Sequence, residues 1–324
     1  MPKRCLPRRK PPARPPNRPP NERKADVLLK GPLLSERILK LGIPKGSLEQ
    51  ATFALFEKAG FTVSGFERSY FPRIDDDEIS LILLRAQEMS RYVADGVLDA
   101  GFTGFDWIVE NGSDVHEVCE LRYSKATNLP TRWVLAVPNE STVQKPEDLA
   151  GGIIATELVN ATRHYFESKN IPVKVEFSWG ATEVKARLVN AIVELTETGS
   201  SIKANNLRIV DTIMTSTTRL IANRQAWRDD FKRTKIENIS ILLNAAIDAK
   251  SRVGMKLNAR KDDLQSVLSL LPSEKSPTIS ELADSSFVAV EIIVEDRVAR
   301  TLVPQLKRAG ASGIITYPLN RVIH

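Results

Sequence analysis

The sequence predicts an α/β fold made of three successive units. Segments typical of strands and of helices alternate from Arg37 to the C-terminus, which is characteristic of α/β domains. Several strand candidates, such as ISLILL at 79–84, are continuous apolar runs. Such runs favour parallel sheets that are covered on both faces. Residues 252–324 follow the order β-α-β-β-α-β, which is the ferredoxin-like unit.

The first unit begins with the apolar strand ILKLGIP at 38–44. Ser47 and Gln50 form a capping-box pattern at the start of the next helix, and Gly60 stands where that helix should end. After the strand at 79–84, we expect a helix at 86–96 and a strand at 98–104. A strand followed directly by a capped helix is the opening of an α/β unit.

The second unit repeats this alternation. Between Arg132 and Asn223 we expect six strands with two helices among them, and a long helix from Arg228 to Ala249 follows. The strands are RWVLAVP, GGIIATE, VKVEFS, AIVELT and two within IVDTIMTSTTRLIAN; the helices are ATRHYFESKN and ATEVKARLVN.

The third unit has two helices and four strands. The strands are RVGMKLNA, PTISELA, SFVAVEIIVE and SGIITYP; the helices are KDDLQSVLSLL and DRVARTLVPQLKRAG, the latter with Asp296 as its expected cap. Such a unit suits ligand sensing or subunit pairing, but the fold alone does not decide between them.

The basic charge of the chain belongs to its N-terminus. The formal net charge is +6, yet residues 1–34 hold ten Lys and Arg against two acids, which leaves −2 for residues 35–324. Nine of the nineteen prolines also lie in 1–34, so we expect a disordered tail. It is an unstructured extension, an arm for an anionic partner such as nucleic acid, or a transit peptide. The body has no basic stripe that would favour nucleic acid.

Several classes of site and location are disfavoured by composition. The only cysteines, Cys5 and Cys119, cannot build a disulfide framework, and His116, His164 and His324 lack the spacing of zinc ligands. No apolar run approaches the roughly 18 residues of a membrane span, and no secretory signal precedes the body. We therefore expect a cytoplasmic protein with no membrane contact.

The segment AIVELTETGSSIKANNL, at 191–207, carries the sharpest chemical pattern. An apolar strand passes into a probable helix through hydroxyl side chains and a glycine, and helix N-termini bind phosphate. Gly199 allows the backbone to approach an anion closely, and Thr198, Ser200 and Ser201 add donors. A simpler interpretation is that Ser200 or Ser201 only caps the helix.

Two further strand-to-helix turns carry acids. In FSWGATEVKARL, Gly180 follows a strand, Thr182 is placed to cap the next helix, and Glu183 lies in its first turn. Glu183 is either a site carboxylate or a capping acid without chemistry. In LDAGFTGFDWIVE, Asp106 follows Gly104 at a strand end, where open α/β sheets bind ligands. A turn without a ligand explains this pattern equally well.

Two charged segments have simple alternatives. Lys45, in Pro-Lys-Gly before the first helix, is placed to meet a phosphate, although a lone loop lysine is usually only solvated. The acid run Asp75–Glu78 carries hard oxygen ligands for a divalent cation. A solvated loop is the more ordinary interpretation of such a run.

Taken together, these segments resemble ATP phosphoribosyltransferase, the enzyme family that opens histidine biosynthesis. The matching pieces are LGIPKGSL, DGVLDAGFTGFDWI, IIATELVNATRHYF, WGATEV and ELTETGSSIKANNL, and near the C-terminus LLPSEKSPTISEL and LKRAGASGIITYPLNRVI. The C-terminal pieces resemble the long form of the family, which needs no separate regulatory subunit.

The resemblance implies a two-lobed body of the type II periplasmic-binding-protein architecture. Lobe I would comprise 35–130 plus 224–251, and lobe II would comprise 131–223. A ferredoxin-like (ACT-like) regulatory domain at 252–324 would bind L-histidine as a feedback inhibitor. The resemblance further implies ATP and phosphoribosyl pyrophosphate (PRPP) as substrates, Mg²⁺ as cofactor, and dimers that assemble into hexamers.

The resemblance also assigns roles to residues. Glu194 and Glu183 would be the catalytic carboxylates. The residues that hold the 5-phosphate of PRPP would be Thr198, Gly199, Ser200 and Ser201, and those that line the cleft for ATP would be Lys45, Gly46, Asp106 and Arg163. A ribosyl-cation-like transition state needs a nearby carboxylate and an anchored phosphate, which agrees with this assignment.

Two other functions remain as alternatives. A solute-binding protein of the same lobed fold would need export, for which the sequence shows no signal. A nucleic-acid-binding protein would have to act through the basic tail alone.

Overall fold

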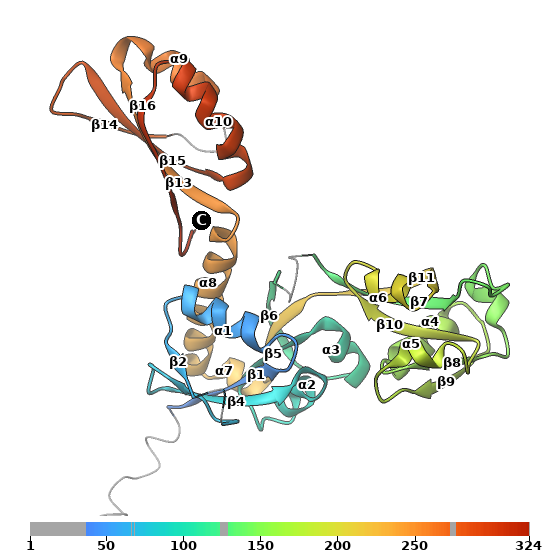
Figure 1. The fold of residues 1–324 in the computed structure, drawn as a ribbon. Coiled ribbons are helices and arrows are strands. Elements are labelled where there is room, and N and C mark those ends of the chain that lie inside the picture. Colours follow the sequence, from blue (N-terminus) through green and yellow to red (C-terminus); the bar gives the residue numbers. More distant parts are fainter. Residues whose placement is uncertain (1–36, 66, 68, 124–128, 273–276, 324) are drawn as a thin grey trace, which may run out of the picture. The chain divides into compact units, whose positions relative to one another are not determined.

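The strands of the computed structural model form three main sheets with helices packed beside them (Figure 1). The structure describes residues 37–323 except 66, 68, 124–128 and 273–276. Within these ranges the sheets have five, five and four strands, and β2 (Val63–Ser64) pairs with β3 (Arg73–Ile74) in a small fourth sheet. The basic segment 1–34 lies outside the described residues, so its disorder stays a prediction.

The first sheet has the strand order β4-β1-β5-β12-β6. Strand β1 is parallel to β4 and β5, whereas β12 is antiparallel to both β5 and β6. The three strands for which a parallel sheet was expected, β1, β4 and β5, are therefore parallel, and β12 is the strand that runs against them. The strands and the helices of this part are β1 (Leu39–Lys45), α1 (Glu49–Lys58), β4 (Ile79–Arg85), α2 (Ala86–Ala94), β5 (Ala100–Gly104), α3 (Phe105–Asn111), β6 (His116–Leu121), β12 (Thr218–Ala222), α7 (Arg224–Arg228) and α8 (Asp230–Ala249).

The second sheet has the order β9-β8-β10-β7-β11 and repeats the same pattern. Strand β8 is parallel to β9 and β10, while β7 is antiparallel to β10 and β11. Its elements are β7 (Thr131–Pro138), the 3₁₀ helix Pro146–Leu149, β8 (Ile153–Thr156), α4 (Val159–Ser168), β9 (Lys174–Phe177), α5 (Thr182–Lys185), β10 (Ala191–Thr196), α6 (Ser200–Ala204) and β11 (Leu207–Ser216).

In both sheets, the antiparallel fourth strand arrives from the other sheet. Strand β7 follows β6 of the first sheet along the chain, and β12 follows β11 of the second. The chain thus passes between the sheets twice, from β6 to β7 and from β11 to β12, with no helix among the described residues in between. Antiparallel strands, unlike parallel ones, need no crossover helix. The predicted two-lobed α/β architecture is thus confirmed, and we call the two sheets with their helices the first lobe and the second lobe. Strand β12 belongs to the first lobe, although the sequence analysis placed residues 131–223 in lobe II.

The third sheet has the antiparallel order β14-β15-β13-β16. Together with its two helices it gives the β-α-β-β-α-β chain order of the ferredoxin-like unit, as predicted. Its elements are β13 (Arg252–Arg260), the 3₁₀ helix Lys261–Asp263, α9 (Leu264–Leu270), β14 (Thr278–Glu281), β15 (Phe287–Glu295), α10 (Asp296–Arg308) and β16 (Ser312–Pro318).

Several predicted helix ends differ from the observed ones. Helix α1 starts at Glu49 without a side-chain cap, so the capping box of Ser47 is wrong, and instead the Glu49 carboxylate accepts from the Gly46 amide at 3.2 Å. Asp296 is the first residue of α10 and does not cap it. Helix α8 is capped as such helices usually are, because Asp229 accepts from the Lys232 amide.

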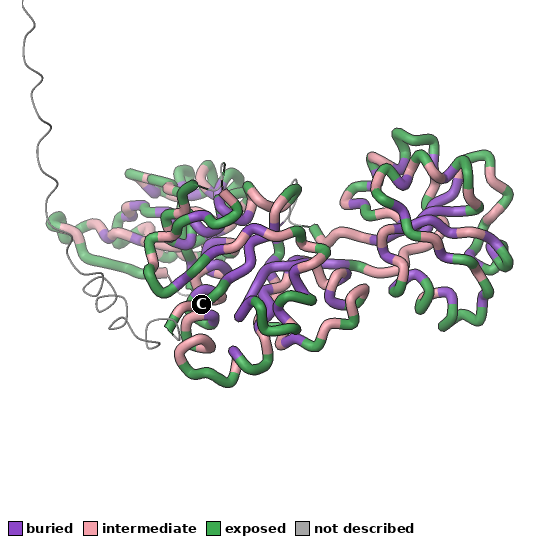
Figure 2. Tube along the Cα trace, turned by 90° about the horizontal axis from the view of Figure 1, so that it is seen from below, coloured by how far each residue is buried: buried purple, intermediate pink, exposed green. Residues whose placement is uncertain are grey.

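Each sheet has its own apolar core, and buried residues concentrate along the strands (Figure 2). In the first lobe, Leu41 and Phe102 from the strands pack with Leu243 of α8. In the second lobe, Leu135 and Val193 pack with Phe166 of α4. Because each lobe buries its apolar residues in its own core, polar residues at the strand ends can face a cavity between the two cores.

Candidate active site

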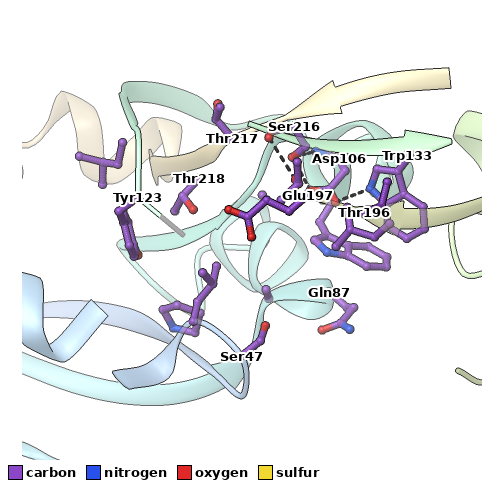
Figure 3. A pocket seen from close by; sticks show the side chains of 18 of the residues that line it. Ser47, Gln87, Asp106, Tyr123, Trp133, Thr196, Glu197, Ser216, Thr217 and Thr218 are labelled. Atoms are coloured by element: carbon purple, nitrogen blue, oxygen red, sulfur yellow. Dashed lines mark hydrogen bonds between the residues drawn. The ribbon is translucent and has the colours of Figure 1, made fainter. Parts of the chain in front are cut away.

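A cavity of about 360 Å³ lies where strand ends of the two lobes meet. Figure 3 shows that side chains from α2, α3, β7 and the β10 and β11 ends point toward it, among them Gln87, Trp133 and Thr196. Its size falls in the usual range for small-molecule sites. Charged lining residues of both signs are Lys45, Arg85, Asp106, Arg122, Glu157, Glu194 and Glu197.

Glu194 is a partly buried carboxyl group in the wall of this cavity. It lies on β10, and burial raises its pKa to about 7, with the charge of Glu183 adding to the shift. Glu157 contributes a smaller repulsion, and a hydrogen bond from the Thr182 side chain opposes the rise. The two predicted catalytic acids therefore lie near each other, with Glu194 in the lining and Glu183 on α5 outside it.

The local fold explains why Glu183 approaches Glu194. Gly180 and Ala181 both adopt positive φ, at +88° and +49°, which turns the chain sharply after β9. Helix α5 is only four residues long, not the ten predicted, and Thr182 opens it as a buried residue hydrogen-bonded to Ser178 at 2.9 Å. Thr182 is thus inside the helix and does not cap it.

The predicted phosphate loop forms a tight turn between β10 and α6. Gly199 has φ of +80°, and its amide donates to the Thr196 hydroxyl at 2.8 Å. The Thr198 hydroxyl donates to that of Ser200 at 3.0 Å, and neither Ser200 nor Ser201 caps the helix. Helix α6 has five residues, so its dipole is small, and hydroxyl and amide donors are what the turn offers an anion. The cavity lining includes Thr196 and Glu197 of this segment but not residues 198–201.

Asp106 lies in the wall of the cavity, but its carboxylate is already bonded on both oxygens. Trp133 donates through Nε1 at 2.7 Å and the Ser216 hydroxyl donates at 2.8 Å (Figure 3). Asp106 is 3% exposed, and burial raises its pKa despite these donors. A Cβ at Gly104 would stand 2.0 Å from the Asp106 carboxylate, so only glycine fits at that position.

The basic residues divide into two groups. Lys45 lines the cavity, with its Nζ 3.9 Å from the centre of the Tyr70 ring, and Arg85 and Arg122 also line it. Gly46 adjoins Lys45 with φ of +110°. Arg163 is exposed on α4 and is not among the lining residues. The structure thus brings Lys45, Asp106 and Glu194 together at the cavity, with Gly46 and Glu183 adjacent to two of them.

Two lining residues that sequence reasoning missed are Glu157 and Gln87. Glu157 directly follows β8, and Gln87 is in the first turn of α2. Burial raises the pKa of Glu157, and the Gln87 side chain hydrogen-bonds to its carboxylate. Both positions follow the carboxyl ends of parallel strands, so the rule that places ligands there would have identified them.

The acid run Asp75–Glu78 is engaged by protein groups. Lys235 of α8 lies 2.9 Å from Asp76 and 2.6 Å from Glu78, and Asp75 accepts from the Thr62 amide at 2.9 Å. These contacts make the run part of a loop that is tied to α8 and to residue 62. Among the residues that the structure describes, no three His, Cys, Asp or Glu side chains are grouped to hold a metal ion.

The membrane expectation can be compared with the helices. Within the described part of the chain, none of the helices combines the length and the apolar character that crossing a membrane would require.

Comparison with known proteins gives two family matches that together span most of the body and the third sheet. Residues 85–245 match the family model described as ATP phosphoribosyltransferase, and residues 249–321 match the model of its C-terminal domain. The ATP phosphoribosyltransferase of Koribacter versatilis is 57% identical over 286 residues, which is 88% of this chain and 99% of that protein. That of Chlorobaculum parvum is 55% identical over 290 residues, covering 89% and 99%.

A solved structure supports the same relationship for the body. A chain of the ATP phosphoribosyl transferase (HisG:HisZ) complex from Thermotoga maritima is 30% identical with a TM-score of 0.56, covering 65% of this chain and 99% of that one. The present chain therefore carries a part that this relative lacks. Its C-terminal domain, joined in one chain to the two lobes, matches the long form. The chain belongs to the ATP phosphoribosyltransferase family, the pentosyltransferases of histidine biosynthesis, in its long form.

Proposed function

We propose that this chain transfers the 5-phosphoribosyl group of PRPP to N1 of ATP, releases diphosphate, and is inhibited by L-histidine. The observation that carries the proposal is the position of Glu194. This acid lines the cavity near the end of β10, and the loop of hydroxyl side chains around Gly199 follows on the same strand-to-helix turn. A phosphate held by the loop would place the ribose beside the carboxylate.

The chemistry needs few proton transfers. The bond between ribose C1 and the diphosphate oxygen breaks, and its electron pair leaves with diphosphate. The N1 lone pair of adenine then forms the new bond to C1. Because this nitrogen is unprotonated at neutral pH, no general base is required, and the ionised Glu194 stabilises the positive charge that develops on the ribose.

The leaving group and the ATP phosphates carry several negative charges. Lys45, Arg85 and Arg122 line the same cavity, and we assign them to the ATP phosphates. Mg²⁺, which usually binds through substrate phosphates and one or two carboxylates, would enter as the chelate of the diphosphate and neutralise part of its charge. Glu157 and Glu197 also line the cavity, and we assign contact with this chelate to their carboxylates.

We assign histidine sensing to the ferredoxin-like domain. Two hydrogen bonds connect the chain after β16 with the first lobe: Arg321 donates to the Ala59 carbonyl at 2.9 Å, and the Val322 amide donates to the Ala245 carbonyl at 3.0 Å. These contacts offer a route from the sensor to α1 and α8. The assembly of dimers into hexamers stays a prediction.

The product assay tests the proposal directly. Purified protein is mixed with ATP, PRPP, Mg²⁺ and pyrophosphatase, which draws the reaction forward, and phosphoribosyl-ATP is measured with and without L-histidine. We expect product that depends on both substrates and falls when histidine is added. Absence of product at high protein concentration would refute the transferase assignment, and product that is insensitive to histidine would refute only the inhibition.

A further inference from the structure

Helix α3 holds two carboxylates that both reach from the first lobe to the second. Asp106 and Glu110 are four residues apart, and residues at this spacing share one face of a helix. Asp106 bonds Trp133 of β7 and Ser216 at the end of β11. Those are the two strands that continue directly into, or arrive directly from, the first lobe, so Asp106 joins both crossing segments.

Glu110 makes the second connection at the start of α4. One carboxylate oxygen accepts from the Asn160 amide at 3.0 Å, and the other accepts from the Ala161 amide at 3.0 Å. The Asn160 side chain also donates to the Glu110 carbonyl at 2.9 Å. Because α4 begins at Val159, these are amides of its first turn, which usually lack partners inside a helix.

The sequence of α4 cannot supply this cap by itself. The residue at its N-cap is Leu158, which makes no side-chain cap bond, since an apolar side chain has no acceptor. A carboxylate at a helix N-terminus is also favoured by the helix dipole. The second lobe therefore obtains the cap of α4 from the first lobe, and this cap breaks if the lobes separate.

We propose that Glu110 is a positioning residue that holds the two lobes at the separation that forms the active-site cavity, acting with Asp106 from the same helix. Glu110 does not line the cavity, so it acts through α4 and the strand before it. That strand, β8, leads into Glu157, which lines the cavity and bonds Gln87 of the first lobe. The effect on catalysis rests on the proposed transferase function, whereas the effect on lobe separation does not.

The role predicts a specific division between binding and rate. PRPP is assigned to the loop of the second lobe, so its dissociation constant should stay within about twofold in Glu110→Ala. Catalysis needs groups from both lobes, so kcat/KM should fall about tenfold, as expected for the loss of charge-assisted hydrogen bonds. Glu110→Gln keeps one acceptor oxygen, so its kcat/KM should lie between that of the parent and that of Glu110→Ala.

The experiment measures lobe separation and activity on the same variants. Spin labels are attached at Glu57→Cys in the first lobe and Glu147→Cys in the second, both exposed, with Cys5 and Cys119 replaced by serine. Double electron–electron resonance then gives the distribution of distances between the two spin labels. Calorimetry gives the affinity for PRPP, and the product assay gives kcat/KM. Glu167→Ala, an exposed acid at the other end of α4, is the matched control.

We expect a broader, longer distance distribution for Glu110→Ala than for the parent and for Glu167→Ala. An unchanged distribution in both Glu110 variants would overturn the proposal. A loss of PRPP affinity that parallels the loss of kcat/KM would also overturn it, because Glu110 would then be a substrate contact. If the parent makes no product but Glu110→Ala changes the distribution, the transferase assignment fails while the positioning role stands.

Discussion

At the scale of single residues, the surroundings of Glu194 decide its protonation state. A carboxyl group with a pKa near 7 is partly protonated at neutral pH, whereas an exposed glutamate is fully ionised. Burial and the neighbouring charge of Glu183 both favour the neutral form. Because the proposed mechanism needs the ionised form, protonation of Glu194 would lower the rate as pH falls below this pKa.

The pH dependence of kcat/KM follows from this pKa. We expect kcat/KM to rise with pH through a limb near pH 7, because ionised Glu194 is the active form. Glu183→Gln removes a repelling charge, so it should lower the pKa of Glu194 and move the limb to lower pH. Glu194→Gln should abolish the limb and most of the rate. A limb that persists unchanged in Glu194→Gln would assign it to another group.

The same pKa has a consequence for stability. A carboxyl whose pKa is raised on folding stabilises the folded state less as pH rises toward that pKa. The Tm of Glu194→Gln minus the Tm of the parent should therefore be larger at pH 8 than at pH 5. Thermal unfolding of both proteins at the two pH values measures this difference.

Gly199 can be compared with Gly151, which has a similar backbone conformation. The comparison separates the effect of backbone strain on stability from an effect on substrate binding. Its φ of +80° favours glycine, yet a Cβ there would meet nothing within 4 Å. Gly151 has φ of +79° and equally open surroundings, and it lies before β8, outside the loop between β10 and α6. Valine at either position should cost about 1–2 kcal/mol of unfolding free energy, because side chains disfavour the left-handed region.

Only the variant in the loop should change substrate binding. We expect Gly199→Val to raise the KM for PRPP strongly and Gly151→Val to leave it unchanged, as measured in initial-rate assays. Equal KM values for the two variants would show that the loop does not hold the phosphate.

At the scale of elements, α8 stabilises the loop before β4 through a single lysine. The Lys235 side chain is 19% exposed and lies between Asp76 and Glu78. Burial opposes the charge of Lys235, but the hydrogen bonds that its ammonium group donates to Glu78 and Asp76 outweigh this effect and raise its pKa. The acid run at 75–78 is thus part of the attachment of α8.

Replacing this lysine should destabilise the protein without affecting the chemistry. We expect Lys235→Met to lower the free energy of unfolding by about 1–2 kcal/mol, since the partly buried Asp76 carboxylate and the exposed Glu78 carboxylate lose their partner. Urea denaturation measures the effect. Lys307→Met, at an exposed position in the last turn of α10, should change it little, and a similar loss in both variants would contradict the role of Lys235.

At the scale of the whole molecule, regulation and catalysis are assigned to different sheets of one chain. Deleting residues 252–324 should abolish inhibition by histidine and retain catalysis, because the cavity lining comes entirely from the first two lobes. The deletion also removes the bonds from Arg321 and Val322 to the first lobe. We therefore expect a lower Tm along with the loss of inhibition.

Removing residues 1–34 is the control for that deletion. The basic charge resides there and the phosphates are assigned to local side chains, so activity and inhibition should both be preserved. Inhibition that survives the C-terminal deletion would place the sensor elsewhere, and lost activity would show that the domain is needed for assembly.

Local patterns allowed much of the fold to be predicted. Apolar runs such as 79–84 predict strands because their burial contributes strongly to the energy, although β4 lies at the sheet edge and buries every second residue. The helix around Leu243 and the ferredoxin-like order near the C-terminus were predicted for the same reason. The extent and caps of short elements were not: α5 has four residues where ten were expected, because such short helices depend on tertiary contacts, and the cap of α1 depends on Glu49 and not on Ser47.

By itself, the sequence determined the α/β class, the ferredoxin-like unit, the motifs of the site and the location of the charge in the N-terminal segment. The tertiary structure alone decided how these motifs act. It buried Asp106 against Trp133 and paired Asp76 and Glu78 with Lys235. It also brought Glu157 to the cavity and capped α4 with Glu110. These outcomes depend on groups far apart in the chain. A local pattern states which side chains are present, but only the folded chain determines which partners and how much solvent each one meets.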